Sequence, residues 1–434
     1  MTANAKPLVA VRGLKKHYPI RKGVLRSEVG RIRAVDGIDL DLYPGETVGL
    51  VGESGCGKST TALSILRLEE PTAGSITFDG QDVLSLSASE MRAYRRQAQL
   101  VLQDPGDAFN PRIPVGQSVG EPLRVHGMGD SQRRRAIVED VLERVGLSAS
   151  AADQYPHAFS GGEKQRLALA RALVLNPDLI VADEPVSALD GRTKTTILSL
   201  LADIQQTYGI AILFISHDLD TVRHFCDRVA VMYLGKIVER GPVPDVLNNP
   251  SHPYTQLLKR SIPDLDPETA LDQLGGTPLT DHLPEAASPP PGCRFHPRCP
   301  AIIQPQSVSM PPDEWRQVAA FYRRLSTLDP TESSPLQALT PAPTTISHTD
   351  EYDTDSLRDA CSLPCEISDV TVETAMKSAL EAILAGHVSE AQSILSDILE
   401  SPCERTEPES YSVQADWDVS CFHYNGTNDG TALE

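Results

Sequence analysis

The chain has 434 residues, of which 40% are hydrophobic, enough for two or three domains and at least one large core. No apolar run approaches the roughly 18 residues of a membrane span, and the first residues lack a signal-peptide core, so we expect a cytoplasmic location or a peripheral one beneath a membrane. The net charge of −20 is concentrated after residue 300, where 23 Asp and Glu stand against 6 Lys and Arg, so the nearly neutral remainder argues against nucleic-acid binding.

The first hundred residues predict strands that flank a basic, aperiodic segment. Residues 8–12 and 38–42 alternate as strands, and the basic segment between them is either a loop or a hairpin. Tyr18 lies in this segment, where it would stack on an adenine ring or hold the edge of a sheet. The stacking role is favoured.

Residues 47–60, TVGLVGESGCGKST, predict a buried strand, a glycine-rich loop and a helix that starts near Ser59. The spacing G-x-x-x-x-G-K-[ST] is typical of a phosphate-binding loop, because residues without Cβ let backbone N–H groups wrap a triphosphate. Lys58 would meet the β- and γ-phosphates, and the Ser59 hydroxyl would ligate Mg²⁺. The alternative is a turn that only connects strand to helix. The nucleotide-contacting residues of the loop are Gly52, Glu53, Ser54, Gly55, Cys56, Gly57, Lys58, Ser59 and Thr60.

A second polar group follows the next predicted buried strand. Residues 75–78 predict a strand with a turn at Gly80, residues 91–94 lie on a helix, and residues 98–102 form a buried strand. Gln103 ends that strand, and its amide would reach Mg²⁺ or the attacking water. A glutamine that merely starts a turn is the alternative.

Residues 115–175 have helical periodicity, including a helix that stops at Gly146 and a long helix from about Gly162. The segment Ser160, Gly161, Gly162 and Glu163 precedes the long helix and exposes its N-terminus. The serine hydroxyl and the glycine N–H groups would hold a γ-phosphate.

Two further buried strands end in polar residues. Residues 179–185, LIVADEP, place Asp183 on the Mg²⁺ shell and Glu184 beside the attacking water, or else form an acidic strand end. A turn at 187–190, a helix at 192–208 and a strand at 211–216 follow, and His217 ends that strand. His217 would contact the γ-phosphate, although a lone histidine is often structural. Residues 229–239 predict a hairpin around Leu234 and Gly235.

Five segments, GESGCGKST, LQDP, SGGEKQR, LIVADEP with SALD, and ISHD, resemble the ATP-binding-cassette ATPases over roughly residues 8–260. The resemblance implies an α/β fold, a P-loop NTPase core whose mixed sheet is covered by helices. It implies a nucleotide-binding domain over 1–262 with a helical subdomain at about 104–176. It also implies that the chain binds ATP and Mg²⁺ and hydrolyses ATP.

The resemblance also assigns roles to the singled-out residues. Ser59, Gln103 and Asp183 would surround Mg²⁺, and Gln103 would also sense the γ-phosphate and the permease. Glu184 is similar to the catalytic base and His217 to the switch histidine. Tyr18 matches the adenine platform. Residues 160–163 would act on ATP held by the opposite subunit.

Three more stretches resemble the oligopeptide and dipeptide permease ATPases: AVDGIDL, QDPGDAFNPR, and NNPSHPYTQLLKRSIPDLDP followed by PPPGCRFHPRCP. The FNPR ending and the insertion before AVDG favour the F-type subunit, with the family's C-terminal region at 263–330. The resemblance implies peptide import at the cytoplasmic membrane face. The implied partners are a D-type ATPase or a second copy, two permeases and an extracytoplasmic solute-binding protein. Import of nickel or sugars, a soluble ATPase in nucleic-acid or ribosome work, and an inactive regulatory cassette are the alternatives.

The sequence departs from this family at several positions. Glu163 stands where the family usually has glutamine, which would weaken that half-site, and Gly191 replaces a β-branched residue. Cys293 and Cys299 often begin a four-cysteine iron–sulfur or zinc cluster in the family, but Gln306 occupies the expected third position. Cys361, Cys365, Cys403 and Cys421 do not complete a spacing typical of a metal ribbon, so reduced thiols are favoured.

The end of the chain predicts a disordered acidic linker at 331–368 and a small helical hairpin with an acidic tail at 369–434. One helix spans 372–385 and stops at Gly386. The next starts at Ser389 with Gln392 in a capping box and ends at 401–402. The sequence leaves docking, regulation and solubility open as functions of this region.

Overall fold

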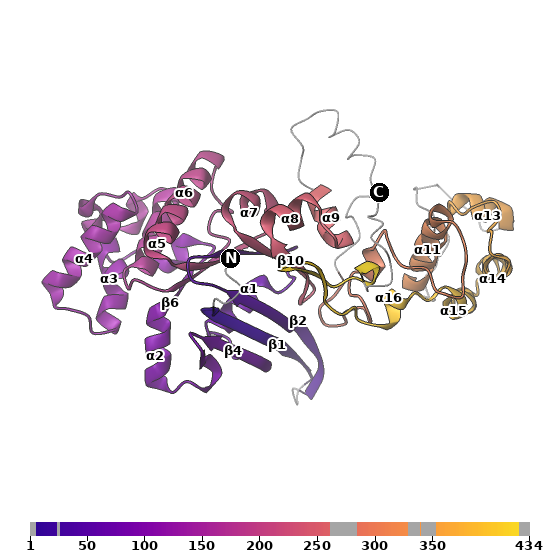
Figure 1. The fold of residues 1–434 in the computed structure, drawn as a ribbon, viewed down its shortest axis with the longest axis horizontal. Coiled ribbons are helices and arrows are strands. Elements are labelled where there is room, and N and C mark those ends of the chain that lie inside the picture. The colour runs from indigo at the N-terminus through magenta and orange to yellow at the C-terminus, as the bar shows by residue number, and fades with distance from the viewer. Residues whose placement is uncertain (1–5, 24–26, 261–283, 329–338, 340–352, 425–434) are drawn as a thin grey trace. The chain divides into compact units, whose positions relative to one another are not determined.

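The computed structural model describes residues 6–23, 27–260, 284–328, 339 and 353–424 (Figure 1). The chain forms two compact units. Of the described residues, the first unit contains 6–23, 27–260 and 284–289, together with residues 412–420. The second unit contains residues 290–328, 339, 353–411 and 421–424. The sequence did not predict that a segment after residue 400 would belong to the first unit.

A four-stranded antiparallel sheet opens the first unit, in the order β2-β1-β4-β5. Its strands are β1 (Val9–Lys22), β2 (Ser27–Leu42), β4 (Ala73–Phe78) and β5 (Gln81–Asp82). The two long strands pair from Val9 with Leu42 to Lys22 with Ser27, so the basic segment is a hairpin and not a loop. Residues 24–26, at the tip of this segment, lie outside the described residues.

An eight-stranded sheet forms the centre of the first unit, in the order β11-β12-β10-β9-β3-β8-β7-β6. Strands β6, β7, β8, β3 and β9 are parallel, and β10 pairs antiparallel with β9 and β12. The strands are β3 (Thr47–Val51), β6 (Ala98–Val101), β7 (Leu179–Asp183), β8 (Ala211–Ser216), β9 (Arg228–Tyr233), β10 (Lys236–Pro242), β11 (Tyr411–Gln414) and β12 (Trp417–Val419).

The central strands are continuous apolar runs because helices cover both faces of a parallel sheet. All six residues of β8 and all five of β3 are buried. The helices around the sheet are α1 (Lys58–Ile65), α2 (Ala88–Gln97), α6 (Gly191–Tyr208), α7 (Leu219–Phe225), α8 (Val243–Asn248) and α9 (Pro253–Arg260). The predicted α/β fold is therefore confirmed, and so are the strands at 47–51 and 211–216.

Three helices build the part predicted as a helical subdomain: α3 (Val115–Val125), α4 (Ser131–Arg144) and α5 (Gly161–Leu173). The helix α4 ends two residues before Gly146, whose φ of +76° is a backbone conformation that glycine adopts without strain. The long predicted helix is α5, which begins at Gly161 behind Ser160. The segment 160–163 forms the N-terminal end of α5.

The second unit is largely helical, with α11 (Pro312–Thr327), α13 (Thr354–Ala360), α14 (Val370–Leu384), α15 (Val388–Leu399) and α16 (Pro402–Arg405). The helix α13 lies inside the predicted disordered linker, so that prediction is wrong for 354–360. There, Arg358 forms a buried ion pair with Glu373 of α14 at 2.9 Å. The remaining linker residues before 353, other than 339, and the residues 263–283 of the predicted C-terminal region lie outside the described residues.

The predicted helical hairpin is present as α14 and α15, but its capping box is wrong. His387, without a side-chain capping bond, precedes α15. Gln392 instead donates from Nε2 to the carbonyl oxygens of Leu325 and Leu328 at 2.8 and 3.1 Å. It thus bonds carbonyls at the end of α11, of which that of Leu325 also accepts the Leu328 N–H at 3.2 Å.

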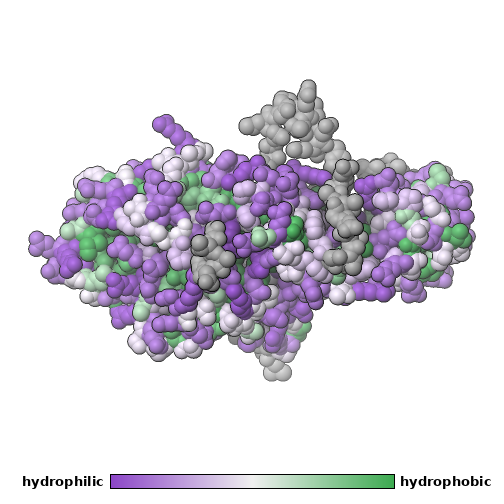
Figure 2. Space-filling view, viewed as in Figure 1, coloured by the Kyte–Doolittle hydropathy of each residue, from purple (hydrophilic) through white to green (hydrophobic). Residues whose placement is uncertain are grey.

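The face of the molecule shown in Figure 2 is mainly hydrophilic, with hydrophobic side chains in small separate areas. Within the described ranges, every helix is too short or too polar to span a bilayer.

Candidate functional site

The glycine-rich loop between β3 and α1 packs so closely on its neighbours that side chains are excluded at two positions. A Cβ on Gly52 would lie 2.1 Å from the Met232 carbonyl oxygen, and one on Gly57 would lie 2.0 Å from the Ala34 carbonyl oxygen. Gly57 also caps α1 with a φ of 111°. The loop is therefore fixed on strands β9 and β2, and its backbone N–H groups precede a helix N-terminus.

Lys58 is buried, and its ammonium group is held inside the loop. The Nζ donates to the carbonyl oxygens of Gly52 and Glu53 at 2.8 and 2.9 Å. These carbonyls hold the cation in place next to the loop, where an incoming phosphate would compete for its hydrogens. Ser59, the next residue, is exposed.

A cavity of about 500 Å³ opens beside the loop, and it is lined by residues from four motifs of the sequence. Glu184 Oε2 accepts a hydrogen bond from Gln103 Nε2 at 3.2 Å and lies 3.0 Å from His217 Nδ1. The three residues follow β6, β7 and β8, whose carboxyl ends meet at one edge of the parallel sheet. The lining residues are Ala34, Ser54, Gly55, Gly57, Lys58, Ser59, Thr60, Gln103, Glu184 and His217.

Glu184 has a φ of +46°, an unusual value for a residue with a side chain. Its N–H donates to the Ile215 carbonyl oxygen at 3.1 Å, which ties this conformation to the adjacent strand β8. The backbone turns directly after β7, and the carboxylate comes within reach of Gln103 and His217. A strained backbone that is held by its neighbours is common at active sites.

Asp183 provides an observation that fits a bound divalent cation. Its Oδ1 is buried, and no described residue donates a hydrogen bond to it. Burial raises the pKa of Asp183, against the influence of a hydrogen bond from the Ser59 hydroxyl. A carboxylate and a hydroxyl are oxygen ligands that Mg²⁺ accepts, and a cation would complete the bonding of the buried oxygen. Clusters of three or more His, Cys, Asp or Glu suited to a metal are absent from the described residues.

Tyr18 lies on β1, paired with Ile32, and is not part of the cavity lining. Lys16 places its Nζ 4.9 Å above the ring. Burial raises the pKa of Tyr18, while a hydrogen bond with the Thr60 side chain lowers it. The ring is therefore next to the phosphate-binding loop, as an adenine platform would be.

The segment 160–163 is not brought to the cavity within one chain. The Ser160 hydroxyl donates to Glu163 Oε2 at 2.8 Å, and the Ser160 N–H donates to the same oxygen at 2.9 Å. This capping box holds the carboxylate at the N-terminus of α5, and the hydrogen bonds lower its pKa.

The two cysteines that resemble the start of a metal cluster lie in the second unit, with another cysteine beside them. The Cys293 N–H donates to the Cys403 carbonyl oxygen at 2.8 Å. Burial raises the pKa of Cys293 to about 11 and also raises the pKa of Cys299. All eight cysteines are free thiols.

Sequence reasoning missed two groups that support the site. The Tyr254 hydroxyl accepts a hydrogen bond from the Glu53 N–H of the glycine-rich loop at 3.0 Å, across 201 residues of sequence. Asp218 caps α7 next to His217 and pairs with Lys194 of α6. In the sequence, the HPYT segment that contains Tyr254 only resembles a family pattern and carries no signal for this contact.

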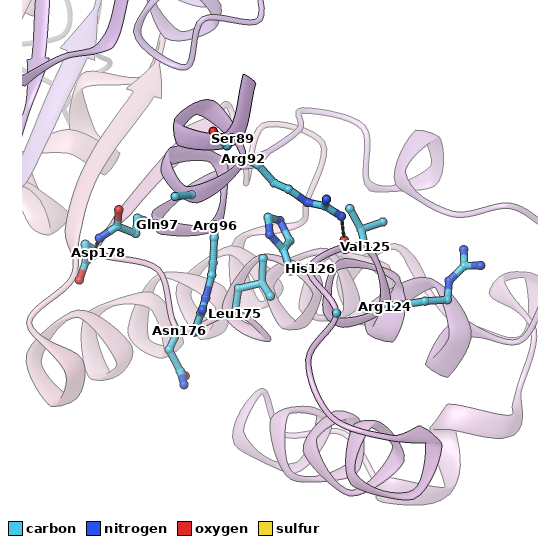
Figure 3. A pocket seen from close by; sticks show the side chains of 12 residues that line it. Ser89, Arg92, Arg96, Gln97, Arg124, Val125, His126, Leu175, Asn176 and Asp178 are labelled. Carbon is cyan, nitrogen blue, oxygen red and sulfur yellow. Dashed lines mark hydrogen bonds between the residues drawn. The ribbon is translucent and has the colours of Figure 1, made fainter. Parts of the chain in front are cut away.

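A second cavity, of about 770 Å³, lies beside α2 and the end of α3 (Figure 3). Arg92, Arg96, Arg124 and His126 line it, and Arg92 donates to the Val125 carbonyl oxygen. Burial lowers the pKa of His126, and the charges of Arg92 and Arg96 lower it further. Three arginines and one carboxylate, that of Asp178, line the cavity, and the Arg124 side chain points away from the other labelled residues in Figure 3. The excess of guanidinium groups favours an anionic ligand.

Three family models match successive parts of the chain. One described as ABC transporter matches residues 35–187, and one described as oligopeptide/dipeptide transporter, C-terminal region, matches residues 238–304. A third, described as a domain of unknown function (DUF8228), matches residues 312–416. The third match includes most of the second unit.

Curated relatives cover the first two of these parts. The oligopeptide transport ATP-binding protein AppF of Bacillus subtilis (strain 168) is 46% identical over 299 residues, which are 69% of this chain and 91% of AppF. A probable peptide ABC transporter ATP-binding protein, y4tS, of Sinorhizobium fredii is 45% identical and covers 70% of this chain and 86% of y4tS. The dipeptide transport ATP-binding protein DppF of Escherichia coli (strain K12) is 43% identical and covers 68% of this chain and 87% of DppF.

Proposed function

The chain belongs to the oligopeptide and dipeptide transporter family of ABC ATP-binding subunits, and from this premise we propose how its residues hydrolyse ATP to drive peptide import. The observation that carries the proposal is the convergence of Gln103, Glu184 and His217 on the cavity beside Lys58.

The triphosphate of ATP would lie in the cavity, along the glycine-rich loop. The N–H groups of the loop and the start of α1 would bind phosphate oxygens, and Lys58 would exchange its carbonyl partners for the β- and γ-phosphates. Tyr18 would stack on the adenine. Bound Mg²⁺ would neutralise phosphate charge, with Asp183, Ser59 and Gln103 holding it.

Glu184 would accept the proton of the water that attacks the γ-phosphate. Gln103 and His217 contact its carboxylate, and their hydrogen bonds would orient both the base and the water. His217 also lies at the cavity wall, where its other ring nitrogen would donate to the γ-phosphate.

The site would be completed by a second ATPase subunit, either a D-type subunit or another copy of this chain. This follows because residues 160–163 lie outside the cavity lining of their own chain. Their N–H groups and the Ser160 hydroxyl would bind the γ-phosphate of the partner's ATP. Two permeases and an extracytoplasmic solute-binding protein would complete the importer at the cytoplasmic face of the membrane.

The cavity beside α2 is the candidate permease contact. It presents Arg92, Arg96 and Arg124, so an acidic permease segment would fit it. Replacing Arg92 and Arg96 with glutamate would then weaken permease binding while leaving ATP binding to the isolated subunit unchanged. Normal recovery of the permeases with this variant would contradict the assignment.

The experiment that tests the function is reconstitution of this chain with its copurifying subunits in vesicles. We expect ATP-dependent uptake of di- or oligopeptides, with ATP hydrolysis stimulated by the loaded binding protein. Uptake of nickel or sugars alone would indicate the alternative solutes. Copurification with ribosomes or nucleic acid instead of permeases would reject import, and ATP binding without turnover would indicate a regulatory cassette.

A further inference from the structure

Residues 412–420, which we call the C-terminal strap, contain β12 and most of β11, the last two strands at one edge of the ATPase sheet. The residues on both sides of the strap belong to the second unit. The strand β12 pairs antiparallel with β10, and the C-terminal strands lie beside β10 in Figure 1. The Ser420 N–H donates to the Val238 carbonyl oxygen at 2.8 Å, and Arg240 pairs with Asp418 at 2.8 Å. The strap is thus held by both backbone and side-chain bonds.

Trp417 is one of two buried strap residues, with Val419, and its indole reaches a buried carboxylate of the first unit. Its side chain lies against Gly241, where a Cβ would be 3.0 Å from the indole Cδ1. The indole Nε1 donates to Glu239 Oε1 at 3.0 Å. Trp417 is 5% exposed and Glu239 is 1% exposed, so this bond lies away from solvent.

The Glu239 carboxylate organises the turn that precedes α9. It accepts the Ser251 N–H on Oε1 at 2.8 Å and the His252 N–H on Oε2 at 3.0 Å. Burial of the carboxylate is unfavourable and raises the pKa of Glu239, and the three N–H donors offset part of this cost. Loss of any one donor would remove a hydrogen bond from the buried Glu239 carboxylate and weaken its hold on the turn.

Hydrogen bonds connect this turn to the glycine-rich loop through Tyr254. The Tyr254 N–H donates to His252 Nδ1 at 3.0 Å, and the Tyr254 hydroxyl accepts the Glu53 N–H at 3.0 Å. The Tyr254 ring also packs on Tyr233, with 4.7 Å between ring centroids. Hydrogen bonds therefore run from the strap through a buried carboxylate and a tyrosine to the backbone of the loop.

We propose that the C-terminal strap positions the phosphate-binding loop, with Trp417, Glu239 and Tyr254 as positioning residues. The chain continues from both ends of the strap into the second unit. The inference rests on the proposed function, because it takes the loop to be the ATP site.

Tyr254→Phe in the full chain tests the last step of the connection. The variant leaves the ring and removes the acceptor of the Glu53 N–H. We expect the Kd of a fluorescent ATP analogue and the KM for ATP to rise about three- to tenfold, with kcat changed less than twofold. Tyr94→Phe is the matched control, because the buried Tyr94 hydroxyl donates to the Ile65 carbonyl oxygen at the opposite end of α1. Tyr94→Phe should lower the melting temperature about as much as Tyr254→Phe does, and it should leave the Kd of the ATP analogue unchanged.

Trp417→Phe tests the first step, since it keeps an aromatic ring and removes the indole N–H. We expect the Kd to rise about threefold in the natural background and not at all in the Tyr254→Phe background. Equal effects in both backgrounds, or an unchanged Kd in both single variants, would overturn the inference. If the unaltered chain bound no ATP analogue, the proposed function would fail instead, so the two failures are distinguishable.

Discussion

Two carboxylates of the first unit stand in opposite environments. Glu184 contacts Gln103 and His217 at the wall of a cavity, and its side chain is 16% exposed. Glu239 is buried, and it accepts hydrogen bonds from two backbone N–H groups and the Trp417 indole. A carboxylate bonded by side chains beside a cavity suits proton transfer, whereas one bonded by buried N–H donors suits the positioning of a backbone.

The two regions meet at Glu53 in the glycine-rich loop. Its carbonyl oxygen accepts from Lys58 Nζ, and its N–H donates to the Tyr254 hydroxyl. On the cavity side of the loop, Lys58 would have to give up its hydrogen bond to the Glu53 carbonyl when phosphate binds. On the opposite side, Tyr254 would keep its hydrogen bond with the Glu53 N–H. The comparison predicts that replacing Glu184 lowers kcat, while replacing Glu239 or Tyr254 weakens the binding of ATP.

Glu184→Gln should have the largest effect. Loss of the base would lower kcat for ATP about 10²- to 10⁴-fold and leave ATP affinity nearly unchanged, so that an ATP-bound dimer accumulates. Single-turnover hydrolysis and analogue binding measure the two quantities. Glu239→Gln is the informative counterpart, because it should change affinity more than kcat. Unchanged turnover in Glu184→Gln would refute the assignment of the base.

Lys58→Ala should weaken the binding of ATP roughly a hundredfold, since hydrogen bonds to a charged group contribute about 2–3 kcal/mol. Calorimetry or a fluorescent analogue would measure the change. Lys259→Ala is the matched control, because the Lys259 Nζ also donates to a backbone carbonyl, that of Asn248, at 2.6 Å. An affinity loss of equal size in both variants would show that Lys58 acts through stability and not through phosphate binding.

The contrast between the carboxylates also explains what could be predicted from the sequence. Gln103, Glu184 and His217 each follow an apolar run that ends at a polar side chain. Taken one at a time, these patterns only suggested a polar group near a phosphate, and the resemblance to the ATP-binding cassettes assigned the residues to one site. The structure brings them together because the carboxyl ends of neighbouring parallel strands meet at one edge of a sheet. Apolar runs and turn residues predicted β3, β8 and the hairpin at Leu234.

The strap could not be predicted in this way. Trp417 and Glu239 are 178 residues apart, and short strands such as β12 have no distinctive periodicity. The linker prediction failed at α13 for a related reason. Polar composition suggested disorder, but the buried pair of Arg358 with Glu373 depends on a tertiary contact that composition does not report.

A third carboxylate, Asp218, is partly buried and accepts hydrogen bonds from side chains, and its titration provides a test that uses pH. Burial tends to raise its pKa, but hydrogen bonds from Lys194 and Thr221 outweigh burial and lower the pKa to about 2. Because the folded pKa lies below the ordinary value, Asp218 stabilises the fold above about pH 4 and loses this contribution as the pH falls toward 2. The melting temperature of Asp218→Asn should lie a few degrees below that of the unaltered chain at pH 7, and the difference should narrow below pH 4. A constant difference would contradict the assignment.

Glu163→Gln should have the smallest effect, an increase of about twofold in ATP hydrolysis by the paired complex. The carboxylate lies at the N-terminus of α5 and occupies the Ser160 hydroxyl, so its charge would oppose the phosphates of the partner's ATP. Glutamine keeps a capping oxygen and removes the charge. Glu90→Gln is a matched control, because Ser87 and Glu90 form the same capping box at the start of α2. An equal gain from both variants would mean that a general charge effect, and not the position of Glu163 opposite a bound nucleotide, accounts for the increase.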